Sequence, residues 1–152
     1  MTANIWTNPQ GQTRLLLPVD GSEPSLRAVD HAIGLAQTLS APASIVLLNV
    51  QSRFSGDVQL FIGGDELHRY HEDEGRKQLA AAEARVAAAG LASESHIVIG
   101  AVVESIDLAS EQYDCQAIVI GGRGLGGIAG VLLGSVANQL LQVARRPVIL
   151  VR

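Results

Sequence analysis

Short apolar runs alternate along this chain with longer segments whose apolar residues recur at helical spacing. The runs are residues 14–19, 44–50, 117–121 and 147–151, with a further strand expected at residues 93–100, whose second half is apolar. The segments between the strands are 23–39, 65–89, 102–112 and 135–145. Such runs are typical of strands buried on both faces, and the spaced segments are typical of amphipathic helices. Strands that alternate with helices join through right-handed crossovers into a parallel sheet. We therefore predict a single-domain α/β fold, a five-stranded parallel sheet with helices on both faces.

The length of the chain fits one domain. It has 152 residues, enough to bury a core without disulfides or metals. Residues 1–12 are polar and are interrupted by Pro9 and Gly11. We expect them to form a flexible N-terminal segment and residues 13–152 to form the folded domain.

Charge and cysteine content limit the partners and the compartment. The net charge is −4, without a basic block, which argues against a nucleic-acid surface. The apolar runs are far shorter than the ~20 residues that span a bilayer, so no membrane partner is expected. The single cysteine, Cys115, excludes an intramolecular disulfide and suits a reducing compartment. We expect a cytoplasmic protein.

Glycine is concentrated between the fourth apolar run and the last helical segment. Residues 121–135 read GGRGLGGIAGVLLGS, with seven glycines in 15 residues. Each glycine costs backbone entropy on ordering, so this density indicates a backbone that bends tightly and approaches a ligand with its N–H groups. Ser135 is expected to cap the following helix, whose positive end favours anions. A strand, a glycine loop and a helix start in this order predict a phosphate site.

Three glycine patterns compete for this segment. Residues 122–127 fit the dinucleotide pattern GxGxxG, but no acidic residue follows them to bind a ribose. The Walker pattern fails because Lys77, the only lysine, lies in a predicted helix. The third pattern is G-x2-G-x9-G-[ST], and it matches Gly121, Gly124, Gly134 and Ser135.

The third pattern resembles the ATP-binding signature of the universal stress protein family. The resemblance extends to a first strand ending in PVD (residues 18–20), a second ending at Val50 and a closing RPVILV (residues 146–151). It implies an adenine nucleotide alpha hydrolase-like sheet with strand order 3-2-1-4-5, and it implies ATP as ligand. It assigns the adenine pocket to Pro18, Val19 and Val50, the ribose and phosphates to Asp20, Ile120, Gly121 and Gly124, and the phosphates at the helix start to Gly134, Ser135 and Val136.

The chain departs from the family pattern at three places, and one assigned residue has a second interpretation. Asn49 stands where members often carry His, and Gln116 stands where members often carry Asp. Residues 100–102 read GAV where members often carry a Gly-x-Pro step. Asp20 resembles the acidic residue that lies near the phosphates, often through a metal, here Mg²⁺. Asp-Gly-Ser after a strand is also ordinary turn chemistry, so both interpretations of Asp20 stay open.

The resemblance implies an ATP-binding module of the stress response that signals through nucleotide binding and hydrolyses ATP slowly at most. Phosphoryl transfer depends on cations and an oriented nucleophile, and the glycine segment holds one cation, Arg123. Two alternatives stay open: an enzyme acting at the α-phosphate of an adenine nucleotide, and a nucleotide-free dimeric interaction module. The last strand would be an apolar edge, so we expect a homodimer through Val148–Val151, as the family's dimers also imply.

Three further expectations concern residues outside the nucleotide pattern. The acidic helix start that carries His68 and His71 is predicted to be a solvated face rather than a metal site. Cys115 is predicted to be a buried, inert thiol. The last helix is predicted to turn its apolar residues inward, and these are Val136, Leu140, Leu141 and Ala144.

Overall fold

The structure is a computed structural model that describes residues 4–53, 63–122 and 133–152. Strands and helices alternate along it, as the sequence predicts. The elements are β1 (Thr13–Pro18), α1 (Glu23–Thr38), β2 (Ala43–Gln51), α3 (Gly64–Ala88), β3 (Ala92–Ile99), α4 (Val102–Gln112), β4 (Ala117–Gly121), α5 (Ser135–Val143) and β5 (Val148–Val151).

The strands form one parallel sheet in the order β3-β2-β1-β4-β5, which confirms the predicted topology. β1 lies at the centre because the chain first adds β2 and β3 on one side of it and then β4 and β5 on the other. β3 and β5 form the two edges. The point where the strand order reverses therefore lies between β1 and β4, and ligands of open parallel sheets bind outside the carboxyl ends of the strands at that point.

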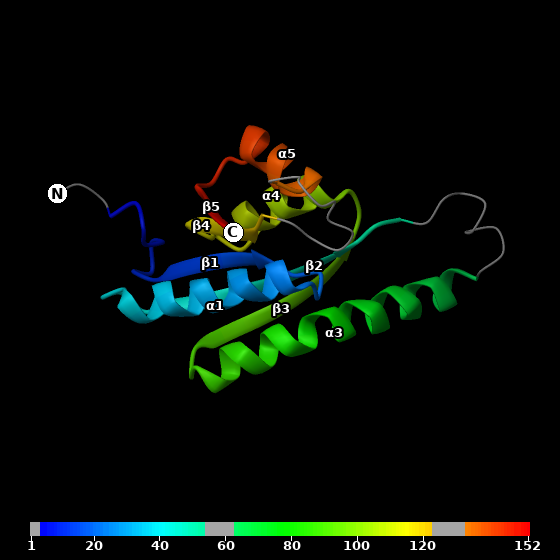
Figure 1. Cartoon of the computed structure of the whole chain (residues 1–152), viewed down its shortest axis with the longest axis horizontal. Helices are drawn as coiled ribbons and strands as arrows, with labels where there is room; N and C mark the ends of the chain where they lie inside the picture. The colour runs from blue at the N-terminus through cyan, green and yellow to red at the C-terminus, as the bar shows by residue number, and fades with distance from the viewer. Residues whose placement is uncertain (1–3, 54–62, 123–132) are drawn as a thin grey trace.

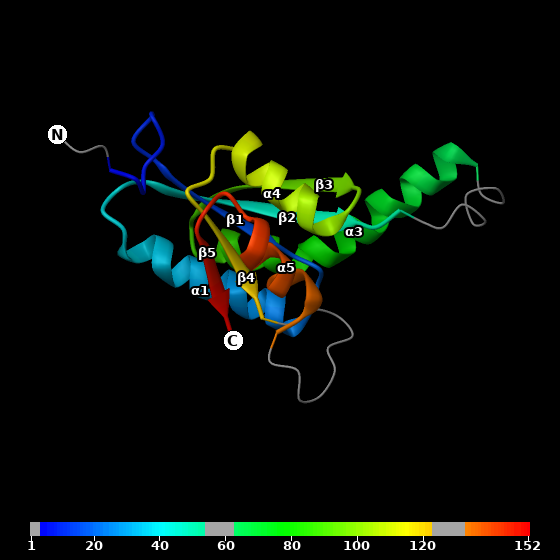
Figure 2. The same cartoon turned by 90° about the horizontal axis from the view of Figure 1, so that it is seen from above.

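Helices cover both faces of the sheet (Figure 1). α1 and α3 pack on one face, where strand residues such as Leu15, Leu17 and Ile45 meet Leu79 of α3. α4 and α5 pack on the other face, seen from above in Figure 2, over the alternate strand residues. Strands buried on both faces account for the near-continuous apolar runs in the sequence.

Two details of α5 differ from the sequence prediction. Its N-cap is Gly134, without a side-chain cap, so Ser135 is the first helical residue and not the cap. The backbone N–H of Gly134 donates to the carbonyl of Gly122, and this bond fixes Gly134 in an extended conformation at the helix start. Leu141 is 46% exposed, whereas Leu140 and Ala137 are buried. The inward stripe of this short helix is therefore narrower than predicted.

Candidate functional site

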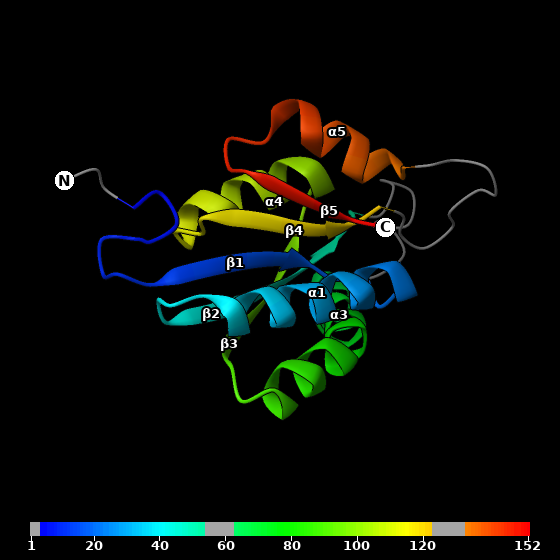
Figure 3. The same ribbon diagram turned by 60° about the vertical axis from the view of Figure 1, so that its left-hand side comes forward.

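The carboxyl ends of β1, β4 and β5 point in the same direction, toward the starts of α1 and α5 (Figure 3). Most of the residues that the sequence analysis assigned to a nucleotide belong to this edge of the sheet. Gly124 and Arg123 lie outside the described residues.

The turn after β1 is held by its own side chains. Asp20 Oδ1 accepts hydrogen bonds from the Ser22 backbone N–H at 2.9 Å and from the Ser22 hydroxyl at 2.5 Å. Gly21 has φ +81°, a left-handed conformation that favours glycine. Ser22 is the N-cap of α1, and its hydroxyl accepts from Ser25 N–H. This arrangement fixes the Asp20 carboxylate at the start of α1, so the turn chemistry that the sequence left open is present.

The end of β4 lies against the first turn of α1. A β-carbon built on Gly121 would stand 2.5 Å from the carbonyl oxygen of Pro24. Only glycine fits such an approach, so one of the signature glycines has a packing role whether or not a ligand is present.

The two ends of the glycine segment meet. Gly122 N–H donates to the carbonyl of Val151 at the end of β5, and Gly134 N–H donates to the carbonyl of Gly122. The start of α5 is thereby attached to the end of β4. The N–H groups in the first turn of a helix have no intrahelical acceptor and carry the positive end of its dipole. Ser135 and Val136 belong to that turn, so this corner of the sheet is suited to an anion.

β2 supplies the opposite wall of the site. The Leu48 carbonyl accepts from Val19 N–H on the β1 side, and the Gln51 carbonyl accepts from Gly100 N–H on the β3 side. Backbone groups of successive strand residues point alternately to the two neighbouring strands. Val50 therefore directs its N–H and C=O toward the β1 side, where the β1–β2 register has already ended at Pro18 opposite Leu48.

Two of the assigned residues can offer little more than backbone, whereas the half-buried Pro18 can still present its ring. The side chain of Val19 is 3% exposed and packs in the core beneath α1 and α3. The Ile120 side chain is 6% exposed and packs on the opposite face, in the core beneath α4 and α5. Pro18 lacks an N–H and ends β1.

A buried polar cluster behind this wall is absent from the sequence prediction. Asn49 is 1% exposed, and its side chain contacts those of Gln51 and Gln78. His71 of α3 faces Gln51 Oε1 and is 3% exposed, so the prediction that it lies on a solvated face is wrong. A signal was present in the sequence: Asn49 is the one polar residue in the run IVLLNV (residues 45–50).

The described residues do not form a metal cage. No group of three or more His, Cys, Asp or Glu side chains that could hold a metal ion occurs within residues 4–53, 63–122 and 133–152. The Asp20 carboxylate at the edge suits the way Mg²⁺ is often bound, by one or two carboxylates together with substrate phosphates. Any Mg²⁺ at this edge would have to share its coordination with a ligand.

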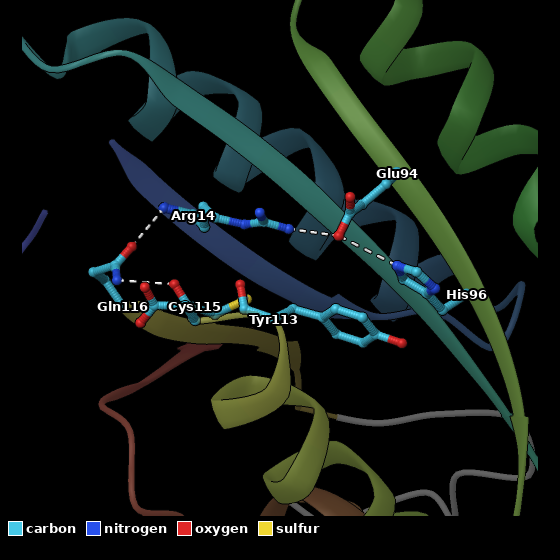
Figure 4. Close-up of polar contacts among 7 residues, drawn as sticks. Arg14, Glu94, His96, Tyr113, Cys115 and Gln116 are labelled. Carbon is cyan, nitrogen blue, oxygen red and sulfur yellow. Dashed lines mark hydrogen bonds and ion pairs between the residues drawn. The ribbon is translucent and has the colours of Figure 1, made fainter. Parts of the chain in front are cut away.

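A second polar cluster lies near the amino end of β1, away from this edge (Figure 4). Arg14 of β1 reaches past β2 to Glu94 of β3, with 2.5 Å between Nη2 and Oε1. His96 contacts the same carboxylate oxygen at 3.2 Å and stacks on Tyr113, with ring centroids 4.0 Å apart. The Gln116 side chain accepts from the Arg14 N–H at 2.7 Å. These contacts join β3, β1 and the α4–β4 connection, and we interpret the cluster as structural.

Cys115 lies beside this second cluster and is fully buried, which confirms its predicted burial. Burial raises the pKa of the thiol to about 12, and the positive charges of Arg14 and Arg146 offset only part of the effect. A thiol that stays protonated at neutral pH is a poor nucleophile and a poor metal ligand.

Membrane insertion receives no support from the helices. Of those in the described part of the chain, none combines the length and the hydropathy that a bilayer-spanning segment needs.

Comparison with known proteins identifies one family. The model of the universal stress protein family matches residues 12–152. The universal stress protein YxiE of Bacillus subtilis is 31% identical over 147 residues, which cover 91% of this chain and 98% of YxiE. The universal stress protein G of Escherichia coli O157:H7 is 32% identical over 149 residues, which cover 91% of this chain and 97% of that protein.

Solved structures share the fold. The hypothetical protein MJ0577 superposes with a TM-score of 0.79 at 24% identity, over 91% of this chain and 94% of that one. A universal stress protein solved in complex with cAMP superposes with a TM-score of 0.67 at 29% identity, over 92% and 97% of the two chains.

Proposed function

The chain belongs to the universal stress protein family, and on that premise we propose that it binds ATP at the carboxyl edge of its sheet and acts as a nucleotide-dependent signalling module. The observation that carries this proposal is the bond between Gly122 and Gly134, which attaches the N-terminus of α5 to the end of β4 at the reversal of strand order. A helix N-terminus beside a strand end offers N–H donors and a positive dipole to phosphates.

An adenine base would lie on the other side of the same edge. Adenine carries an amine donor beside ring-nitrogen acceptors, and Val50 presents a backbone acceptor and a backbone donor side by side. Asp20, held by Ser22 at the start of α1, would face the ribose and phosphates. The relative in complex with cAMP supports an adenine nucleotide as the ligand class.

Mg²⁺ would accompany the triphosphate rather than occupy a separate site. Asp20 is the carboxylate in position to share the ion with phosphate oxygens. The ion would neutralise phosphate charge and so reduce repulsion between the nucleotide and Asp20. We therefore expect Mg²⁺ to strengthen binding of ATP more than binding of AMP.

Titration calorimetry with ATP, ADP, AMP and cyclic AMP, with and without Mg²⁺, tests this function. A sample of the protein is first denatured and analysed by liquid chromatography for co-purified nucleotide. We expect saturable ATP binding in the parent and its loss in Gly134→Val, because a β-branched side chain at the N-cap obstructs the helix start. Gly34→Ala, on the exposed face of α1 with no atom within 4 Å of the added carbon, is the matched control.

Each outcome has a distinct meaning. If no nucleotide co-purifies with the protein and none of the four nucleotides gives a heat of binding, the dimeric interaction module becomes the better description. Steady release of AMP from ATP would instead identify an enzyme acting at the α-phosphate. Slow release of ADP is compatible with the proposed signalling role.

We also propose that two copies pair through the β5 edge. Val148–Val151 is an apolar edge strand, and three of its four residues stay partly exposed in the single chain. Exposed apolar edges are normally covered or paired. Light scattering coupled to gel filtration should give a dimer mass, reduced to monomer by Ile149→Lys and unchanged by Ser95→Lys at the β3 edge. A monomeric parent would contradict this pairing.

A further inference from the structure

The amide of Asn49 uses both of its donor hydrogens and one lone pair of its oxygen. Nδ2 donates to the Val19 carbonyl at 2.8 Å and to Gln78 Oε1 at 2.7 Å. Oδ1 accepts from Gln51 Nε2 at 2.7 Å. If the Asn49 amide were rotated by 180°, its oxygen would face the Val19 carbonyl oxygen and Gln78 Oε1, so these partners determine its orientation. A buried amide with three partners holds them in fixed positions.

The chain of side chains has one direction. Gln51 Oε1 is an acceptor, so His71 Nδ1, 3.4 Å away, donates to it. Gln51 then donates to Asn49, and Asn49 donates to the Val19 carbonyl. Hydrogen bonds aligned in this way polarise one another, and the last acceptor is a backbone oxygen at the candidate site.

The bond to Val19 interrupts the β1–β2 ladder. In the parallel register that pairs Pro18 with Leu48, the Val19 carbonyl is the acceptor that the Val50 N–H would use next. The Asn49 side chain donates to that carbonyl and holds its direction, and the described backbone contains no Val50-to-Val19 hydrogen bond. The strand pairing therefore ends at Leu48, two residues before Val50.

The same cluster supports the turn after β1 from the α3 side. A β-carbon on Gly21 would stand 3.4 Å from the Cα of Gln78, so α3 passes close to that turn. Asn49 and Gln78 thus fix both the carbonyl of Val19 and the packing of the residues that lead to Asp20.

We propose that Asn49 is a positioning residue for base recognition: by holding the Val19 carbonyl, it keeps the Val50 N–H free for an acceptor atom of adenine. The proposal rests on the proposed function. Replacing Asn49 with leucine, which has a similar volume and no donor, releases the Val19 carbonyl to the Val50 N–H. The strand then extends by one pair, and the base loses its donor.

Amide hydrogen exchange tests the strand part of this proposal without any ligand. In the unliganded parent, the Val50 amide should exchange at least about tenfold faster than the Leu48 amide, since the described backbone offers no acceptor to the first and the second lies in the ladder. In Asn49→Leu the Val50 amide should become protected. Equal protection of the two amides in the parent would overturn the proposal, even if no variant folds.

Binding of AMP and IMP tests the recognition part. The two nucleotides share the phosphate and differ along one edge of the base: N1 is an acceptor in AMP and carries a hydrogen in IMP, and the amine at position 6 is replaced by a carbonyl acceptor. We expect the parent to prefer AMP and Asn49→Leu to reduce the AMP/IMP affinity ratio about tenfold, the value of one hydrogen bond. The matched control is Thr13→Val, which removes a buried hydroxyl at the amino end of β1 and should keep the ratio.

The outcomes separate the two proposals. A parent that binds neither nucleotide removes the proposed function, and the positioning role falls with it. If the parent binds AMP and the folded Asn49→Leu variant keeps the same AMP/IMP affinity ratio, the positioning role alone is overturned. A fall in affinity for both nucleotides at constant ratio would also overturn it, because loss of stability affects them equally.

Discussion

Gly121 and Pro24 touch at the point where β4 ends and α1 begins. A β-carbon on Gly121 would stand 2.5 Å from the carbonyl oxygen and 2.7 Å from the carbonyl carbon of Pro24. These are backbone atoms, so no side-chain rotation can relieve the contact. The approach fixes the separation between α1, which follows the Asp20 turn, and the strand that leads into the glycine segment.

Gly121→Ala should therefore lower the free energy of unfolding by about 1–3 kcal/mol, the usual cost of overpacking a closed site. Gly34→Ala is the matched substitution at an open helical position with no neighbour within 4 Å, and it should stabilise by about 0.5–1 kcal/mol. Urea denaturation of the two variants and the parent measures both effects. Unchanged stability of Gly121→Ala would contradict the close approach.

Gly75 of α3 has a corresponding role against β3. A β-carbon there would lie 2.8 Å from both Cδ1 and Cγ2 of Ile97. We expect Gly75→Ala to destabilise the protein in spite of the higher helix propensity of alanine. Ile97→Ala removes all of the crowded atoms, so the double variant should lose less stability than the sum of the two single variants. A double-mutant cycle by urea denaturation measures this coupling, and strict additivity would contradict it.

The fold could be predicted because the signals for it are local. Periodicity and turn residues located each element, and most boundaries agree to within one or two residues, as α4 at Val102–Gln112 illustrates. The edge that carries the candidate site follows from topology, because parallel strands align their carboxyl ends. The turn after β1 could be predicted because Asp, Gly and Ser in that order form local side-chain hydrogen bonds.

The details that were missed depend on long-range contacts. Ser135 resembles a cap in sequence, but the bond between Gly134 and Gly122 moves the helix start by one residue. The Asn49 cluster joins β2 to α3, and no pattern within either segment reveals which side chains will meet. His71 is buried for the same reason, since its cover comes from another element.

Asp107 of α4 should be the more important of the two carboxylates that bind Arg145, which follows α5. It accepts from the backbone N–H of Arg145 at 3.0 Å and from its guanidinium at 2.9 Å, whereas Glu111 contacts the guanidinium alone, at 2.6 Å. Asp107 is also better shielded, with 14% of its side chain exposed against 41% for Glu111.

Urea denaturation of two alanine variants compares these carboxylates. We expect Asp107→Ala to cost about 1–2 kcal/mol, since it leaves a backbone donor without its partner. Glu111→Ala should cost less than about 1 kcal/mol, as exposed ion pairs do. Equal losses would show that the backbone bond contributes little.

The buried thiol of Cys115 should make stability fall at alkaline pH. Burial raises its pKa from 9.0 to about 12, so between these values the folded state keeps a proton that the unfolded state releases. The free energy of unfolding is therefore unaffected by this group below pH 9 and falls as the pH rises toward 12, by up to about 1.4 kcal/mol per pH unit. Cys115→Ala removes this contribution while leaving the other titrating groups, so urea denaturation between pH 8 and pH 10 should give a shallower decline for the variant than for the parent. If the free energy of unfolding declines equally with pH in the parent and in Cys115→Ala, the folded protein releases the thiol proton as readily as the unfolded chain. Rapid chemical labelling of the native thiol at pH 8 would then show that Cys115 is accessible rather than buried.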